Sequence, residues 1–199
     1  MSYAIIGTGK AGQALAKAFA RKGIEVAMAS RRPSEALAPV AKAIGQTIIP
    51  KSLRDAVKAD IVILAIPFGT QKEVAKAVES WQGKIVIDMT NAYGVSPEEL
   101  GNLPSSVVIS QAFPGAKLVK AFNQLSAEVL AEDPNVKGGR RVVFLSSDDE
   151  GAAAQVAALV EQLGFAPVQL GKLAEGGLLI QARGKTWAQL IFQDFVKFK

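Results

Sequence analysis

Three glycines near the start of the chain have the spacing of a phosphate-binding turn. Gly7, Gly9 and Gly12 fit the pattern G-x-G-x-x-G, between an apolar stretch that predicts a strand and a stretch that predicts a helix. The first glycine permits a tight turn, the second lets the backbone approach a pyrophosphate, and the third lets the helix pack close to the sheet. Unpaired N–H groups at the start of such a helix favour an anion. We therefore predict that residues 7–12 bind the pyrophosphate of a dinucleotide.

The end of the next predicted strand indicates which dinucleotide is bound. NAD-binding proteins usually carry an Asp or Glu about twenty residues after the glycines, where it accepts a hydrogen bond from the ribose 2′-hydroxyl. This chain has Ser30, Arg31 and Arg32 at that place. One hydroxyl and two guanidinium groups suit a 2′-phosphate, which a carboxylate would repel. The pattern predicts NADP(H) rather than NAD(H), and the alternative is that both arginines are ordinary surface residues.

Residue types that are missing narrow the chemistry. The sequence has no histidine and no cysteine, which excludes a Ser–His–Asp triad, a thiol nucleophile, a disulfide and a thiolate metal site. The Asp and Glu residues form no cluster with a recognisable metal-ligand spacing, so we predict no metal site. A reaction carried out by this protein should therefore need little proton transfer.

Charge and hydropathy limit the partners. The net charge is +5, but the basic residues are spread along the whole chain without interleaved aromatics, so we expect no nucleic-acid partner. The longest apolar run, residues 61–68, is far too short to cross a bilayer. The N-terminus shows no basic segment followed by an apolar one, the pattern of a secretory signal. We expect a cytoplasmic protein that has no membrane partner.

Strands and helices are predicted to alternate, which is typical of an α/β fold with a doubly wound parallel sheet. The predicted strands are residues 2–7, 25–30, 46–49, 61–66, 84–88, 117–121, 141–146 and 166–170. The predicted helices are residues 10–22, 33–44, 53–58, 70–81, 126–131 and 149–163, and one or two more follow residue 171. Residues 89–106 are rich in Asn, Gly, Ser and Pro and should form an irregular loop, whereas residues 107–113 fit a strand or a helix. We expect a sheet domain over residues 1–170 and a helical appendage over residues 171–199.

With these residues placed, the chain resembles the NADPH:coenzyme F-420 (deazaflavin) oxidoreductases and the cytosolic NADPH-binding domain of the six-transmembrane metalloreductases. The resemblance covers nearly the whole chain. Its more specific carriers are Ser-Arg-Arg at 30–32, Ile-Leu-Ala-Ile-Pro-Phe at 63–68, Asp-Met-Thr-Asn at 88–91 and Val-Lys-Ala-Phe-Asn at 119–123. It implies a Rossmann domain whose small C-terminal part closes over the cofactor cleft.

The resemblance also implies roles for individual residues. By position, the pyrophosphate cradle comprises Thr8, Gly9, Lys10 and Ala11, and the 2′-phosphate site comprises Ser30 and Arg31. The ribose and nicotinamide would be bordered by Ala65, Ile66, Pro67, Phe68, Thr90 and Asn91. Phe122 and Asn123 would line the place where a second cofactor stacks on the nicotinamide. Core packing is the alternative for the two phenylalanines, whereas asparagines at strand ends suit a cleft.

Hydride exchange between a nicotinamide and a flavin or deazaflavin is the chemistry of the cofactors themselves and does not oblige the protein to supply an acid or base. This agrees with the missing histidine, and we assign no catalytic residue. We expect an NADP-dependent oxidoreductase whose small-molecule redox acceptor is a deazaflavin, FMN, FAD or a quinone. Two alternatives are a non-catalytic NADP(H) sensor and a reductase of a small imine or carbonyl substrate. Reductases of the latter kind have a larger C-terminal helical domain than this length of chain holds.

The segment after residue 170 is more apolar than a small appendage can easily bury. Its large apolar side chains include Leu178, Leu179, Ile180, Leu190, Ile191, Phe192, Phe195 and Val196. We predict that they pack across a two-fold interface, which would make the protein a homodimer.

Overall fold

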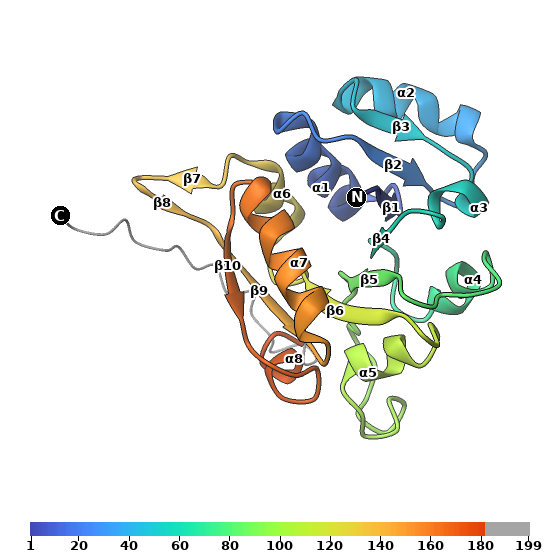
Figure 1. Cartoon of the computed structure of the whole chain (residues 1–199), viewed down its shortest axis with the longest axis vertical. Coiled ribbons are helices and arrows are strands. Elements are labelled where there is room, and N and C mark those ends of the chain that lie inside the picture. The colour runs from blue at the N-terminus through green and yellow to red at the C-terminus, as the bar shows by residue number, and fades with distance from the viewer. Residues whose placement is uncertain (182–199) are drawn as a thin grey trace.

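The computed structural model describes residues 1–181 and shows an eight-stranded sheet with helices on both faces (Figure 1). Across the sheet the strands follow the order β10-β9-β6-β5-β4-β1-β2-β3. Their bounds are β1 Tyr3–Ile6, β2 Val26–Ala29, β3 Ile48–Pro50, β4 Ile61–Leu64, β5 Ile85–Asp88, β6 Lys117–Ala121, β9 Val142–Ser147 and β10 Ala166–Gln169. The chain order reverses between β1 and β4, and such a switch point is where open α/β sheets bind their ligands.

The helices divide between the two faces of the sheet, because successive side chains of each strand point to opposite faces. The bounds are α1 Lys10–Arg21, α2 Ser34–Ile44, α3 Leu53–Ala56, α4 Gln71–Ala75, α5 Ser105–Ser110, α6 Ala127–Ala131, α7 Glu150–Gln162 and α8 Gly176–Leu179. Ile5 of β1 packs into the core formed with α1, α2, α6 and α7. Its neighbours Ala4 and Ile6 pack into the core formed with α3, α4 and α5. This arrangement confirms the predicted doubly wound α/β class.

The edge of the sheet formed by β9 and β10 departs from the parallel arrangement predicted from the sequence. Strand β9 pairs with β6 in the antiparallel sense, with Val119 opposite Ser147, and β10 is parallel to β9. The cause is the connection between β6 and β9. Helix α6 packs on α1, and the chain then returns through the ribbon of β7 Asn135–Val136 and β8 Gly139–Arg140, which projects from the body in Figure 1. Strand β9 therefore begins near the end of β6 and runs back beside it in the opposite direction.

The turn between β7 and β8 is a tight hairpin that was not predicted from the sequence. Lys137 and Gly138 both have positive φ angles, of 49° and 85°. They form the two-residue loop between the paired residues Val136 and Gly139. Two successive residues with positive φ are the mark of a type I′ hairpin turn, which matches the twist of the strands beside it.

Two predicted elements differ in extent. The helix predicted over residues 70–81 ends at Ala75, because the chain turns and the buried Trp81 side chain packs back on the helix end. Its indole Nε1 donates a hydrogen bond of 2.9 Å to the Ala75 carbonyl oxygen. The undecided segment at 107–113 lies largely within α5 and the turns after it, and residues 89–104 form the predicted irregular loop.

The C-terminal segment is described as far as Gln181. Leu173 and Ile180 are buried, whereas Leu179 is 68% exposed. The predicted interface residues at 190, 191, 192, 195 and 196 lie outside the described residues, so the homodimer stays a prediction. Within residues 1–181 no helix has the length and apolar character needed to span a membrane, and no His, Cys, Asp and Glu side chains gather as a metal site would require.

Candidate dinucleotide-binding site

The glycine turn between β1 and α1 has the backbone geometry that its sequence predicts. Gly7 has φ of +120°, and a Cβ atom there would collide with the carbonyl oxygen of Ala65 at the end of β4. A Cβ on Gly12 would overlap the Gly7 carbonyl oxygen and lie 3.3 Å from the Ala65 Cβ. Around the Cβ position of Gly9, by contrast, there is no atom within 4 Å. The first and third glycines are thus required by packing, and the second leaves space beside the backbone.

The start of α1 is arranged to receive an anion. In the described part of the chain no side chain caps this helix, and its first turn has no acidic residue. The Gln13 side chain donates a hydrogen bond of 2.8 Å to the Thr8 carbonyl oxygen, which fastens the turn to the helix. The first N–H groups of a helix have no partner within it. Their position beside the open space at Gly9 fits a pyrophosphate group.

A pocket of about 360 Å³ joins this turn to the end of β2. Its lining includes Gly7, Thr8, Gly9, Ser30, Arg31, Arg32, Ala65, Ile66 and Pro67, together with Leu53, Thr70, Glu73 and Val74. The structure therefore brings three separate predicted segments into one cavity. Lys10 and Ala11 are exposed at the start of α1 beside it, and Gly12 is buried beneath the turn.

The three residues after β2 are connected to both walls of this pocket. The Arg32 backbone N–H donates to the Ser30 hydroxyl at 3.1 Å, and the Arg32 guanidinium Nη2 donates to the Thr8 hydroxyl at 3.2 Å. Arg31 Nη1 lies 3.7 Å from a carboxylate oxygen of Glu73 in α4. Both guanidinium groups are exposed, so they can reach a phosphate without prior unfolding of the site. A hydroxyl and two cations at one mouth of the pocket suit a 2′-phosphate.

The predicted nicotinamide-end residues gather separately, at the ends of β5 and β6. The Asn91 side-chain amide donates to the Asn123 carbonyl oxygen at 2.9 Å, and the Asn123 amide donates to Asn91 Oδ1 at 3.0 Å. Asn123 also donates to the Ile180 carbonyl oxygen at 2.7 Å, which attaches the C-terminal segment to this cluster. Within residues 1–181, Thr90 Oγ1 and Asn123 Oδ1 are buried and have no hydrogen-bond partner. Unsatisfied buried polar atoms of this kind are suited to contacts with a polar ligand.

The two predicted aromatic site residues do not line an open site. Phe122 is completely buried and packs edge-on against Phe165, with ring centroids 6.4 Å apart. Its φ of +61° turns the side chain into the core, which favours the alternative of core packing, and a place for Phe122 in a second-cofactor site stays a prediction. Phe68 is half-buried against the core on the α3–α5 face and is not among the residues of the pocket.

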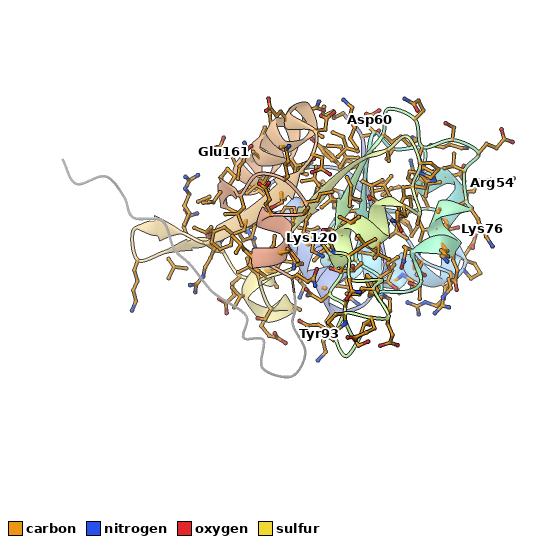
Figure 2. All side chains as sticks on the ribbon, turned by 90° about the horizontal axis from the view of Figure 1, so that it is seen from below. Arg54, Asp60, Lys76, Tyr93, Lys120 and Glu161 are labelled. Atoms are coloured by element: carbon orange, nitrogen blue, oxygen red, sulfur yellow. The ribbon has the colours of Figure 1, made fainter. Side chains whose placement is uncertain are left out.

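A buried ion pair at the same strand ends was not predicted from the sequence. Lys120 and Asp88 are both fully buried, and the Lys120 ammonium lies 2.9 Å from Asp88 Oδ2. The ammonium also donates to the Thr90 carbonyl oxygen at 2.6 Å, while Asp88 Oδ1 accepts from the Thr90 N–H at 2.8 Å. In Figure 2, Lys120 lies within the body of the molecule, whereas Lys76 and Glu161 lie at its periphery. The pair holds the bend that leads from β5 to the predicted nicotinamide-end residues.

A signal for this pair was present in the sequence. Asp88 is the one charged residue of β5, Lys120 lies among apolar residues of β6, and the parallel pairing of the two strands puts them directly opposite one another. Cross-strand neighbours on the same face of a sheet are close enough to interact. The pair could have been predicted from the alignment of β5 with β6, but the sequence alone did not give that register.

The fold and the pocket define a Rossmann-type dinucleotide-binding protein, and comparison with known proteins shows what the chain is similar to. Residues 2–92 match the family model described as NADP oxidoreductase, coenzyme F-420-dependent. A hypothetical protein, SMa0349 from Sinorhizobium meliloti, is 41% identical, with a TM-score of 0.91 over 98% of this chain and 96% of that chain. A protein from an Arthrobacter species, provisionally described as an F-420-dependent NADP-reductase, is 28% identical, with a TM-score of 0.73 over 90% of each chain.

Among curated relatives, metalloreductase STEAP2 from mouse is 29% identical over 87% of this chain and 34% of its own length. The chain thus spans about a third of the length of the metalloreductases that it matches. Residues 2–92 of the chain are thus similar to NADP-dependent, coenzyme F-420-type oxidoreductases. This agrees with the resemblance inferred from the sequence motifs.

Proposed function

We propose that this chain binds NADP(H) at the switch point of its sheet and exchanges hydride with a flavin-like acceptor, either a deazaflavin of the F-420 type or a flavin. The observation that carries the cofactor half of the proposal is the pocket in which Ser30, Arg31 and Arg32 face the glycine turn. The family description and the description of the Arthrobacter relative support the deazaflavin acceptor.

The division of labour follows from the residues present. When bound, NADPH supplies the hydride, and no proton need come from the protein. The open space at Gly9 and the uncapped start of α1 would bind the pyrophosphate. Arg31 and Arg32 would bind the 2′-phosphate, and the unsatisfied Thr90 Oγ1 would contact the nicotinamide half. The protein would then contribute chiefly by holding the two rings close together and correctly oriented. Positioning two reactants in this way removes a large part of the activation free energy of a reaction between them.

The C-terminal segment belongs to the acceptor end of the site in this proposal. Asn123 holds the Ile180 carbonyl oxygen, and the Ser105 backbone N–H donates to the Gln181 side chain at 2.6 Å. These two bonds fix residues 176–181 beside the ends of β5 and β6. The segment would thereby limit the space that is open to an acceptor ring and exclude water from the reaction.

The test is NADPH oxidation by the purified protein against a deazaflavin, FMN, FAD, quinones and ferric chelates, with NADH in parallel. Steady turnover with a deazaflavin or flavin, faster with NADPH than with NADH, is the expected result. Tight binding of NADPH without turnover against the whole panel would instead favour a sensor that regulates another protein. Equal affinity for NADPH and NADH would contradict the role given to the residues after β2.

The substitution Arg31→Asp tests that role directly. It removes a charge-assisted hydrogen bond and adds a repulsion, so NADPH binding should weaken by about 2 to 3 kcal/mol while NADH binding changes little. Lys42→Asp is the matched control, because Lys42 is exposed on α2 outside the pocket and the charge changes by the same amount. Isothermal titration calorimetry with both nucleotides gives the comparison. An equal loss in the two variants would mean that only net charge matters.

A further inference from the structure

One carboxylate shares the pocket with the residues that await the 2′-phosphate. Glu73 of α4 lines the same cavity as Ser30, Arg31 and Arg32, and comes from the wall formed by the β4–α4 connection. Its Oε2 lies 3.7 Å from Arg31 Nη1. The two side chains are 80% and 56% exposed, so the pair bridges the mouth of the pocket in contact with solvent. No motif in the sequence connected Glu73 with this site.

Arg31 has five N–H donors and can contact two anions, but its single positive charge cannot neutralise both a 2′-phosphate and the Glu73 carboxylate. A phosphate monoester carries a charge of about −1.5 to −2 at neutral pH and binds guanidinium groups through charged hydrogen bonds. When such a group reaches Arg31, the carboxylate shares the guanidinium charge with the phosphate and faces a like charge beside it. The 2′-hydroxyl of NAD(H) brings no charge and leaves the pair between Arg31 and Glu73 intact. Glu73 therefore acts differently on the two nucleotides.

We propose that Glu73 is a specificity-determining residue that competes with the 2′-phosphate for Arg31, weakening NADP(H) binding and speeding its release. This inference rests on the proposed NADP(H) site and deepens it. While the cofactor is bound, Glu73 repels the phosphate. As the cofactor leaves, Glu73 takes Arg31 back and so lowers the free energy of the empty site. An oxidoreductase must exchange NADP⁺ for NADPH at every turnover. A carboxylate that speeds release of the bound nucleotide would therefore speed this exchange.

The size of the effect follows from the exposure of the pair. Exposed ion pairs contribute little because water and salt screen them, but the phosphate bears up to about two charges and sits among cations at a partly enclosed mouth. We therefore expect a change in affinity of about three- to tenfold. The effect should shrink as the ionic strength rises through about 0.15 M, where the screening length is about 8 Å.

The experiment compares the parent protein with Glu73→Gln and with Glu79→Gln. Glu79 is exposed on the segment that follows α4 and is not among the pocket residues, so it controls for the loss of one negative charge. The dissociation constants of NADPH, NADP⁺ and NADH are measured by calorimetry, and the dissociation rate of NADPH by stopped-flow fluorescence. Binding alone is the readout, so no acceptor is required.

The proposal predicts that E73Q binds NADPH and NADP⁺ about three- to tenfold more tightly, with slower dissociation, while its affinity for NADH stays within about twofold. E79Q should behave like the parent protein. Unchanged or weaker NADPH binding by E73Q would overturn the proposal, since Glu73 would then merely hold Arg31 in place. Equal tightening for NADPH and NADH would overturn it as well. If the parent protein showed no preference for NADPH over NADH, the proposed function itself would fail, and this inference with it.

Discussion

Replacing Lys120 by methionine should cost this protein a large part of its stability. The substitution keeps most of the side-chain volume but removes the ammonium that lies 2.9 Å from Asp88 Oδ2 and donates to the Thr90 carbonyl oxygen at 2.6 Å. Both charged side chains are fully buried. Removing one partner of a buried pair leaves the other charge uncompensated, and the usual cost is about 3 to 5 kcal/mol. A small domain is stable by only about 5 to 15 kcal/mol, so the loss is easily measured.

The assay is equilibrium unfolding in urea followed by circular dichroism. With a slope of about 2 kcal/mol per molar urea, a loss of that size lowers the midpoint by about 1.5 to 2.5 M. Lys117→Met is the matched control, because Lys117 lies on the same strand but is 44% exposed and pairs with Asp149 at the surface. Its midpoint should move little, since exposed pairs contribute little.

A double variant keeps the reasoning testable if Lys120→Met alone fails to fold. Asp88→Asn combined with Lys120→Met removes both charges, and the asparagine oxygen can still accept from the Thr90 N–H. The double variant should therefore be more stable than Lys120→Met by at least about 1 kcal/mol. Unfolding of Lys120→Met at the same urea concentration as Lys117→Met, or a further full loss from the second substitution, would contradict the predicted role of the buried pair.

Three shorter predictions concern the turn, the C-terminal segment and acid stability. Gly9→Ala should leave the melting temperature unchanged, because no atom lies within 4 Å of the new Cβ, yet weaken NADPH binding at least about tenfold by blocking the pyrophosphate; normal binding would contradict the predicted phosphate position. Gly12→Ala should instead lower the melting temperature, because its Cβ overlaps a backbone oxygen. Asn123→Ala should speed amide hydrogen exchange over residues 176–181 by releasing the Ile180 carbonyl oxygen, and unchanged exchange would show that other contacts hold the segment. Asp149 caps α7, and a hydrogen bond from a backbone N–H of that helix holds the pKa of its carboxyl below the ordinary value of 3.8. Its stabilising effect is therefore present above pH 3.8 and lost as the pH falls through the lowered pKa, so Asp149→Ala should be less stable than the parent at pH 7 and converge with it in acid; a constant difference in melting temperature would contradict this.

Features that depend on neighbouring residues were predictable from the sequence. The glycine turn, the residues after β2 and most strands follow from local patterns, because turns, helix starts and buried strands are set by residues a few positions apart. The positive φ at Gly7 and the close packing at Gly12 agree with the reasons given for those two glycines. The hairpin turn at Lys137 and Gly138 was not predicted, and the antiparallel entry of β9 was missed with it.

Features that depend on strand register or on a single backbone angle were not predictable. Phe122 follows an apolar strand as a cleft residue would, and only its φ of +61° directs the ring into the core. Both predicted asparagines do lie at strand ends, but their pairing with one another depends on how β5 and β6 align. The acceptor, the dimer and the cytoplasmic location stay predictions.

By itself, the sequence determined a dinucleotide turn, a cationic end to the second strand, a doubly wound sheet and a chemistry without histidine or cysteine. Each of these properties is carried by residue types, by short spacings or, for the sheet, by the alternation of predicted strands and helices along the chain. The tertiary structure alone decided that Glu73 reaches Arg31 and that Asp88 meets Lys120. Those partners are 42 and 32 positions apart in the sequence, and charged groups interact through distance in space, which only the packed fold fixes. The first residues of the chain therefore identify the ligand, while the fold sets the contacts that adjust how tightly it is held.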